Sequence, residues 1–323
     1  MAGLTQLRPR PVAVSAFWQA GAAELHMQLV AGTAGMSRLI TEAAINRPGL
    51  GLTGFFRYFA HRRIQVIGLA ENEYLASLDP SQREKRVRSF YEQKIPCVVV
   101  TRNKRVPPEM ISLAEEFQIP LFRSRMVTKR FVNAATIIME NLMAPRVLVQ
   151  GTMVEIMGIG VLIEGKPGMG KSETALGLIK KGHALVSDDV TQLRLDSSGS
   201  VIGSPVGVTR YHMEIRGVGV IHVPSLFGVA SVRDEKKLDF VATLCDPEPR
   251  DDEDRSAVGG RTAEFLGVRI PRILIPVAPG RDLANVIETA ALDEKLRRLG
   301  HDAAKELDER LVAVMARGKS ASE

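Results

Sequence analysis

The chain has 323 residues, of which 45% are hydrophobic and 25% are charged. This is the composition of a globular protein, long enough for two domains, and it excludes a disordered or fibrous chain. No uninterrupted apolar run approaches the ~20 residues of a membrane-spanning helix, and the N-terminus lacks the apolar segment of a signal peptide. We therefore expect a cytoplasmic protein with no membrane partner.

The net charge of +6 is unevenly distributed along the chain. Residues 1–150 carry 20 Lys and Arg against 11 Asp and Glu, whereas residues 151–323 carry 23 against 26. The basic residues are scattered, without an arginine-rich arm or a recognisable nucleic-acid-binding motif. We interpret them as a solvated surface and expect no nucleic-acid partner. Cys97 and Cys245 are too isolated to form a disulfide framework or a zinc cluster.

Between residues 60 and 143 the sequence alternates strand-like and helix-like segments. Arg63–Leu69 and Ile95–Thr101 are rich in β-formers, and the charged stretch Tyr74–Gln93 between them is compatible with helix, with turn signals at Asp79–Pro80. The later elements are expected as a helix, a strand and a second helix, at Pro107–Phe117, Ile119–Phe122 and Lys129 to about Met143. This order predicts a small α/β domain with a largely parallel sheet.

The spacing of residues in this first half does not indicate a catalytic site, so its function is unclear from sequence. Pro145 marks a plausible junction, because a proline disfavours continuation of the preceding helix. We therefore expect domains at 1–145 and 146–323. The second begins with two β-rich stretches, Val147–Met157 and Gly160–Glu164.

A glycine-rich loop follows the second of these strands. It satisfies the pattern G-x-x-x-x-G-K-[ST] with Gly165, Lys166, Pro167, Gly168, Met169, Gly170, Lys171 and Ser172. The loop joins an apolar strand to a helix that ends at Gly182, which is the context a phosphate-binding loop requires, because backbone N–H groups and the helix N-terminus then face the phosphates. Lys171 is expected to reach the β- and γ-phosphates of the bound ligand, and the Ser172 hydroxyl to bind Mg²⁺.

Two carboxylates end the next predicted strand, Ala184–Ser187. Asp188 and Asp189 follow it directly, and a parallel strand at this place would return its end to the edge of the sheet that carries the loop. Tandem acids are often turn formers or helix caps. Beside a phosphate loop they predict catalysis, with one holding the metal ion through water and the other accepting a proton from an attacking hydroxyl.

Residues 214–223 read EIRGVGVIHV, which alone is compatible with a turn before a strand. Together with the loop GKPGMGKS and the sequence SDD, this segment resembles the signature of the HPr kinase/phosphorylase family. Asp254–Arg255 and the stretch Ile275–Ala284 also resemble that family, as does the helical stretch after it. The resemblance is strong over about 150–300 and looser before that, where residues 40–56 and the IPCVVVT strand resemble the family's N-terminal domain.

The resemblance implies an enzyme that uses ATP to phosphorylate a serine of the phosphocarrier protein HPr. It also implies the reverse process, in which inorganic phosphate attacks phosphoserine and pyrophosphate is released. A homohexamer and a C-terminal P-loop fold similar to phosphoenolpyruvate carboxykinase are implied as well.

The resemblance further implies roles for individual residues. Asp189 would accept the proton in phosphorylation and donate it in the reverse reaction, beside Asp188. Glu214 would be a metal ligand together with Ser172, and Arg255 would stabilise charge in the transition state. The segment 276–281 would serve mainly dephosphorylation.

Several alternatives stay open at this point. Glu214 and Arg216 could form a local surface ion pair, and Arg255 could be a solvated charge in an acidic run. The second half could be a kinase for another protein or small molecule, or a nucleotide-sensing regulator without catalysis. The charged segment after Gly300 has the apolar spacing of an amphipathic helix.

The sequence departs from the family pattern at one position. The family has a histidine before a glycine on the strand that leads to the phosphate loop, and this chain has Gln150 before Gly151. Glutamine forms hydrogen bonds but carries no proton at neutral pH. We expect the kinase direction to survive and the phosphorylase direction to be the one at risk.

Overall fold

The structure is a computed structural model that describes residues 10–246, 261–301 and 306. The chain divides into two compact units between Pro145 and Arg146. Each unit combines strands with helices, so the predicted α/β class is confirmed. In the described part of the chain, no helix is long and apolar enough to cross a membrane. Arg255 and most of the segment expected to form a helix after Gly300 lie outside the described residues.

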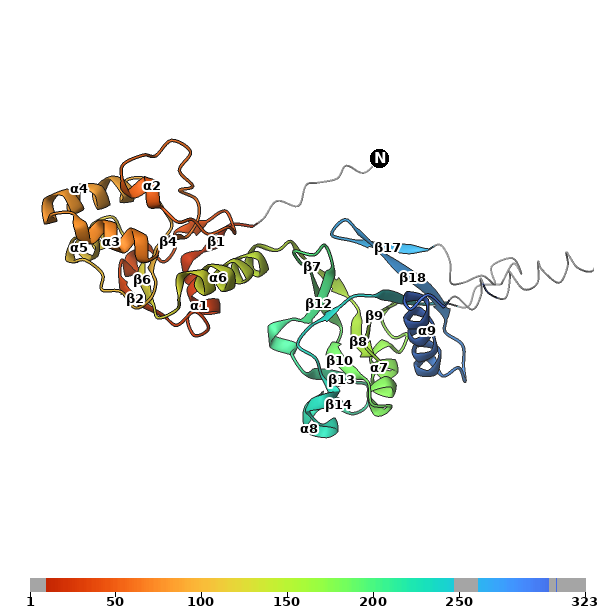
Figure 1. The fold of residues 1–323 in the computed structure, drawn as a ribbon. Helices are drawn as coiled ribbons and strands as arrows, with labels where there is room; N and C mark the ends of the chain where they lie inside the picture. The colour runs from red at the N-terminus through yellow and green to blue at the C-terminus, as the bar shows by residue number, and fades with distance from the viewer. Residues whose placement is uncertain (1–9, 247–260, 302–305, 307–323) are drawn as a thin grey trace, which may run out of the picture. The chain divides into compact units, whose positions relative to one another are not determined.

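The N-terminal unit is built on a four-stranded sheet in the order β2-β6-β5-β4 (Figure 1). β4 (Gln65–Ile67), β5 (Val98–Val100) and β6 (Leu121–Ser124) run parallel, and β2 (Met27–Ala31) pairs antiparallel with β6. The sheet is therefore largely parallel, as the alternation of predicted strands and helices indicates.

Helices cover both faces of this sheet. α1 (Val14–Gly21) and α6 (Thr128–Met143) share one core with Val66, Val99 and Phe122. α4 (Pro80–Tyr91) and α5 (Pro108–Glu116) share the other core with the intervening strand residues. Alternate residues of each strand point to opposite faces, so hydrophobic strand residues are buried on both sides. The smaller elements are β1 (Val12–Ala13), η1 (Thr33–Gly35), β3 (Leu39–Ile40) and α2 (Gly49–Leu52).

The charged stretch between β4 and β5 forms two helices. α3 (Leu69–Ser77) ends before Asp79, whose side chain accepts a hydrogen bond from the backbone N–H of Gln82 at 2.9 Å and caps α4. Pro80 occupies the first position of α4, where its missing N–H costs no helical hydrogen bond. The break therefore falls at the predicted turn signal.

The C-terminal unit contains a six-stranded sheet in the order β10-β8-β9-β16-β18-β17. Its strands are β8 (Thr152–Ile156), β9 (Ile159–Glu164), β10 (Ala184–Ser187), β16 (Phe240–Cys245), β17 (Thr262–Phe265) and β18 (Val268–Pro276). β9, β16 and β18 are parallel neighbours, and the remaining pairings are antiparallel.

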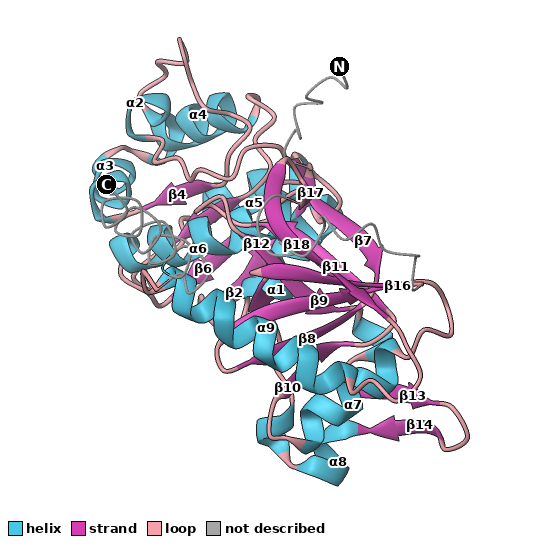
Figure 2. Cartoon of the chain, turned by 90° about the vertical axis from the view of Figure 1, so that its right-hand side faces the viewer, coloured by secondary structure: helices cyan, strands magenta, loops and turns pink. Residues whose placement is uncertain are grey.

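Each face of this sheet has its own cover (Figure 2). α7 (Lys171–Lys180) and α9 (Leu283–Arg298) pack on one face in a shared core. On the other face, residues of a second sheet, in the order β15-β12-β11-β7, share a core with β8, β9 and β16. Its strands are β7 (Arg146–Gln150), β11 (Val190–Leu195), β12 (Val201–Pro205) and β15 (Lys236–Lys237).

A hairpin of β13 (His212–Ile215) and β14 (Gly219–His222) lies beside α7, and α8 (Val223–Phe227) follows it (Figure 1). The short helices η2 (Gly207–Thr209) and η3 (Val229–Ser231) flank this segment. Within the EIRGVGVIHV segment, Glu214 and Ile215 end β13, residues 216–218 form the turn, and β14 follows, so the segment contains the turn before a strand that its residues suggest.

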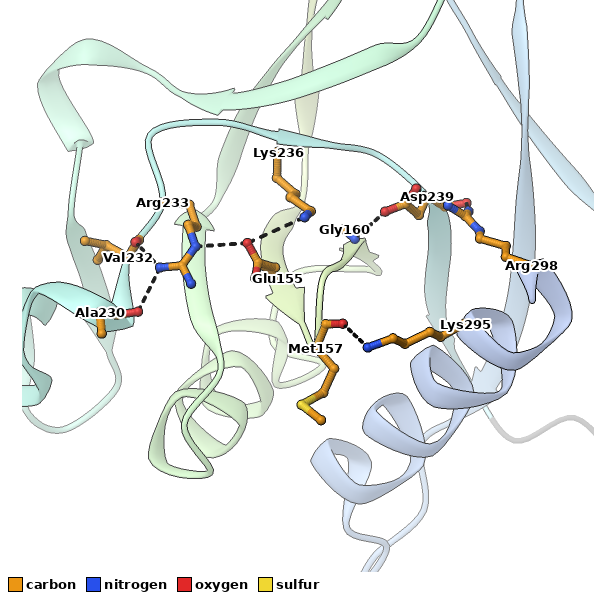
Figure 3. A network of polar contacts seen from close by, with 10 residues as sticks. All are labelled: Glu155, Met157, Gly160, Ala230, Val232, Arg233, Lys236, Asp239, Lys295 and Arg298. Atoms are coloured by element: carbon orange, nitrogen blue, oxygen red, sulfur yellow. Dashed lines mark hydrogen bonds and ion pairs between the residues drawn. The ribbon is translucent and has the colours of Figure 1, made fainter.

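Polar contacts fasten α9 to the sheet (Figure 3). The buried Asp239, 4% exposed, accepts a hydrogen bond from the backbone N–H of Gly160 at 2.6 Å and forms an ion pair with Arg298. One turn earlier, Lys295 donates to the carbonyl of Met157 at 2.8 Å. The C-terminal half of α9 is therefore tied to the turn between β8 and β9.

Candidate active site

The phosphate loop leaves β9 and enters α7, as the motif predicts. Gly165, Gly168 and Gly170 have φ values of 157°, 85° and 85°, in a region that L side chains rarely adopt. Gly170 is the N-cap of α7, and no side chain caps this helix end. Backbone donors at the start of α7 are therefore not consumed by a capping side chain, which suits an anion.

The two lysines of the loop are held by local partners. Lys171 Nζ donates to the carbonyl oxygens of Gly165, at 3.0 Å, and Lys166, at 3.3 Å. Lys166 Nζ forms an ion pair with Asp246 at 2.7 Å, and the hydrogen bond from this exposed pair raises the pKa of Lys166. Phosphate oxygens can replace these partners, because both lysine side chains are exposed or partly exposed and such contacts contribute little stability.

Asp246 is a carboxylate that the sequence analysis did not identify. It directly follows β16, the parallel neighbour of β9, so it lies at the edge of the sheet that carries the loop. A carboxylate immediately after a buried apolar strand is a signal that could have revealed it.

Asp188 is the most highly connected acid at this edge. It is 7% exposed, and its Oδ1 accepts hydrogen bonds from Ser172 Oγ at 2.9 Å and Thr152 Oγ1 at 2.8 Å. Its Oδ2 accepts a bond from the backbone N–H of Glu214 at 3.2 Å. One carboxylate thus joins the start of α7, β8 and the β13–β14 hairpin. Sequence spacing did not identify Thr152.

The strand that carries this pair does not pair as expected. We expected β10 to return as a parallel strand, but it is antiparallel to β8, which lies between β10 and β9. Because β8 is antiparallel to both, β10 and β9 still run in the same direction. The carboxyl end of β10 therefore lies at the sheet edge that carries the phosphate loop, as expected. It does so although β10 pairs with β8 and not directly with β9.

Asp189 differs from its neighbour in exposure and in backbone geometry. Its side chain is exposed, and its φ of 61° lies in the left-handed region. Its carbonyl accepts a hydrogen bond from the backbone N–H of Gly151 at 2.8 Å, and Val190 stands opposite Gln150 in the β11–β7 ladder. Gln150, exposed at the end of β7, is therefore beside Asp189. The position where the sequence departs from the family pattern adjoins the proposed proton acceptor.

The hairpin contributes Glu214 and Arg216, both exposed. Within the described ranges, no ion pair joins them, so the alternative of a local pair receives no support. A Cβ placed on Gly168 would lie 3.8 Å from Arg216 Nη2, which puts this guanidinium beside the loop. Across the residues that the structure describes, no three His, Cys, Asp or Glu side chains converge on a possible metal position. The metal roles of Ser172 and Glu214 stay predictions.

The segment 276–281 begins at Pro276, the last residue of β18. Since β18 is parallel to β16, this segment starts at the same edge as the phosphate loop. Arg281 Nη1 donates to the carbonyl of Pro276 at 3.3 Å, which closes the turn into α9. Its expected role in dephosphorylation stays a prediction.

A glycine loop between a buried strand and a helix, with carboxylates at the same sheet edge, defines a P-loop phosphotransferase. Comparison with known families agrees with this class. Residues 13–139 match the HPr Serine kinase N terminus, and residues 141–311 match the HPr Serine kinase C-terminal domain. The chain belongs to the HPr serine kinase family, and the resemblance seen in its motifs is confirmed.

Two curated relatives extend over most of the chain, and one solved structure matches half of it. The HPr kinase/phosphorylase of Leptospira biflexa is 41% identical over 89% of this chain and 90% of its own length. The HPr kinase/phosphorylase of Caldicellulosiruptor bescii is 38% identical over 92% of this chain and 96% of its own length. The solved Hpr(Ser) kinase/phosphatase from Coxiella burnetii is 35% identical, covering 50% of this chain and 98% of its own, with a TM-score of 0.46.

Proposed function

We propose that this protein transfers the γ-phosphoryl group of ATP to a serine of HPr and also catalyses phosphate-dependent removal of that group. The observation that carries the proposal is the arrangement at one sheet edge: the phosphate loop, Asp188 bonded to Ser172, and the exposed Asp189. Family membership over both units supports HPr as the substrate.

The oxygen groups around Ser172 fit a magnesium ion. Mg²⁺ prefers oxygen ligands and is usually held by one or two carboxylates together with substrate phosphates. Ser172 Oγ lies 2.9 Å from Asp188 Oδ1, and the exposed Glu214 follows in the hairpin whose backbone binds the same carboxylate. We assign the ion to Ser172 and Glu214, with Asp188 holding the serine hydroxyl in place. When bound, the ion neutralises charge on the phosphates.

Asp189 is the group that moves the proton. As the HPr serine oxygen attacks the γ-phosphorus, Asp189 accepts its proton, and the bond from phosphorus to the ADP oxygen breaks. In the reverse direction, inorganic phosphate attacks phosphoserine, Asp189 returns the proton to the departing serine oxygen, and pyrophosphate forms. The exposure of Asp189 supports this role, because an incoming protein must reach it.

Lys171, with the backbone N–H groups of the loop, binds the phosphates. Its present carbonyl partners are neutral, so a phosphate oxygen is a stronger acceptor for its ammonium group. Arg255, assigned by resemblance to stabilise the transition state, lies outside the described residues.

We also propose a homohexamer in the cytoplasm, on the strength of the family resemblance. Large apolar side chains on the hairpin and α8 are exposed in the single chain, namely Val218, Val220 and Leu226. An apolar surface of this kind suits a contact with another chain. Light scattering of the purified protein measures the number of subunits.

A kinase for another substrate and a nucleotide sensor without catalysis are the competing functions. The test is phosphate transfer from ATP to purified HPr, together with pyrophosphate release from phospho-HPr in inorganic phosphate. We expect both reactions, and loss of both in Ser172→Ala. ATP binding with no HPr modification would exclude the proposal and favour one of the competitors.

A further inference from the structure

The β13–β14 hairpin packs at its base against α7, the helix that follows the P-loop. Met213 and Ile215 are buried in the core that includes α7, so the alternating residues of this strand face away from that core. The turn closes with a hydrogen bond from the N–H of Val218 to the carbonyl of Ile215 at 3.0 Å. Arg216 is the first residue inside this turn, and Gly217, with a φ of 82°, is the second.

The hairpin is also anchored to the carboxylate of Asp188. The backbone N–H of Glu214 donates to Asp188 Oδ2 at 3.2 Å, two residues before Arg216. The position of the arginine is thus linked to the acid that holds the Ser172 hydroxyl. This connection fixes the base of the side chain relative to the start of α7.

The guanidinium of Arg216 lies against the middle of the phosphate loop. A Cβ on Gly168 would meet Arg216 Nη2 at 3.8 Å and no other described heavy atom within 4 Å. Gly168 is the fourth residue of the eight-residue motif, between the strand end and the lysine. Backbone N–H groups of this part of the loop cradle phosphates in P-loop proteins.

Arg216 is distinguished from the other cations of the site by its contacts. Lys166 forms an ion pair with Asp246, and Lys171 donates to two carbonyls of the loop. Across the described ranges of the chain, no hydrogen bond or ion pair engages the Arg216 side chain, and the residue is exposed. The anchored hairpin therefore places Arg216 beside the phosphate loop, with no side-chain partner among the described residues.

We propose that Arg216 is a phosphate-contacting residue of this site, whose guanidinium binds oxygens of the two terminal phosphates of ATP and of pyrophosphate. The proposal rests on the P-loop function proposed above and does not depend on which protein receives the phosphoryl group. A planar guanidinium presents paired N–H donors that match two phosphate oxygens at once. It also neutralises charge that develops on those oxygens during transfer.

The test measures binding of magnesium pyrophosphate and MgATP to the full chain by calorimetry. Arg216→Ala is expected to weaken pyrophosphate binding about 10- to 100-fold, the range of a charge-assisted hydrogen bond. Arg216→Lys keeps the charge but not the paired donors, so its affinity is expected to lie between those of Arg216→Ala and wild type. Thermal unfolding of each variant checks that the fold is retained, and Arg216→Gln replaces any variant that unfolds.

Arg210→Ala is the matched control. Arg210 precedes the same hairpin and carries the same charge, but it pairs with Asp234 and stacks over Tyr211. Its removal is expected to change pyrophosphate affinity by no more than about twofold, as for an exposed pair. Equal weakening by Arg210→Ala and Arg216→Ala would show a general charge effect and overturn the assignment.

Wild-type pyrophosphate affinity in a folded Arg216→Ala or Arg216→Gln protein would also overturn it. Binding of pyrophosphate needs no HPr, so the two proposals can fail separately. If pyrophosphate affinity depends on Arg216 but HPr is not modified, the proposed substrate is overturned and the assignment of Arg216 stands. If wild type and Arg216→Ala phosphorylate HPr with equal efficiency and bind pyrophosphate with equal affinity, only the assignment of Arg216 is overturned.

Discussion

Both units place the carboxyl ends of parallel strands at one sheet edge, yet the two edges are chemically opposite. In the N-terminal unit, the turn after β4 is packed shut, since a Cβ on Gly68 would meet Thr128 Oγ1 at 3.0 Å and Glu71 Oε2 at 3.1 Å. In the C-terminal unit, the loop after β9 is tightly packed only where it leaves the strand, since a Cβ on Gly165 would meet Leu244 Cβ at 3.0 Å. The loop is open where it enters α7, and a Cβ on Gly170 would meet nothing within 4 Å.

Polar groups follow the same division. At the N-terminal edge, Glu71 is 6% exposed, accepts a bond from the N–H of Gly68 at 3.0 Å and pairs with Arg47 at 2.9 Å. The hydroxyls of Thr101 and Thr128 bond to each other at 2.8 Å. At the C-terminal edge, Asp189 is exposed and the loop lysines have partners that phosphate can displace. The same strand arrangement thus serves as a sealed structural edge in one unit and as a ligand site in the other.

Removing the exposed acid of the open edge has the largest expected effect. Asp189→Asn should lower the rate of HPr phosphorylation by about 10²–10⁴-fold, the usual contribution of a positioned general base. Asparagine tolerates the left-handed backbone of this position, so the melting temperature should stay near that of wild type. The measurement is kcat with HPr, and Asp196→Asn, in a distant turn, is the control. Retention of full activity in Asp189→Asn would assign the proton to another group.

Removing the buried carboxylate at the sheet edge of the N-terminal unit should lower stability and leave activity unchanged. Glu71→Ala removes a buried acceptor and leaves the N–H of Gly68 without its partner, which should lower the free energy of unfolding by about 1–3 kcal/mol. HPr phosphorylation below the melting temperature should be unchanged. Denaturant unfolding measures the stability. Glu73→Ala on the same helix removes an exposed pair with Lys104 and should cost less than about 1 kcal/mol.

Changing Gln150, the residue beside Asp189, should affect the rate of dephosphorylation more than the rate of phosphorylation. Gln150→His should raise pyrophosphate release from phospho-HPr by about tenfold, less than a full general acid provides, because Asp189 already transfers the proton. Phosphorylation of HPr should change little. Equal and robust pyrophosphate release by both proteins would show that Gln150 is no handicap.

A small pH effect should come from the contact between α7 and α9. Hydrogen bonds from Lys181 and then His183 lower the pKa of Glu288 from its ordinary value of 4.5. The stabilisation is therefore present above that value and is lost as the pH falls through the lowered pKa. Glu288→Gln should reduce the melting temperature at pH 7 by an amount worth under about 1 kcal/mol, and the difference from wild type should vanish in strong acid. A difference that grows in acid would contradict this account.

Sequence reasoning located the features that depend on local spacing. The phosphate loop, the Asp188–Asp189 pair and the break at Asp79 all follow from residues within a few positions of one another. The largely parallel N-terminal sheet follows from the alternation of strands and helices. These signals are local, so no knowledge of the tertiary structure was needed to find them.

The features that could not be predicted from the sequence depend on contacts between distant segments. β2 joins the N-terminal sheet beside β6, about ninety residues later in the chain, and no pattern in its own residues shows this partner. Thr152 reaches Asp188 only because β8 is inserted between β9 and β10. Asp246 and Arg216 approach the loop from a parallel strand and a hairpin, and their spacing from the motif carries no such information.

The most direct test of the account follows the γ-phosphoryl group in a single turnover with HPr and radiolabelled ATP. The label should appear on an HPr serine with the wild-type chain and with Glu71→Ala, and it should reach HPr at least about 100-fold more slowly with Asp189→Asn. Label that remains on ATP or appears only as free phosphate with the wild-type chain would contradict the assignment of phosphotransfer to the open edge of the C-terminal unit. Label that reaches HPr at the wild-type rate in Asp189→Asn would contradict it as well.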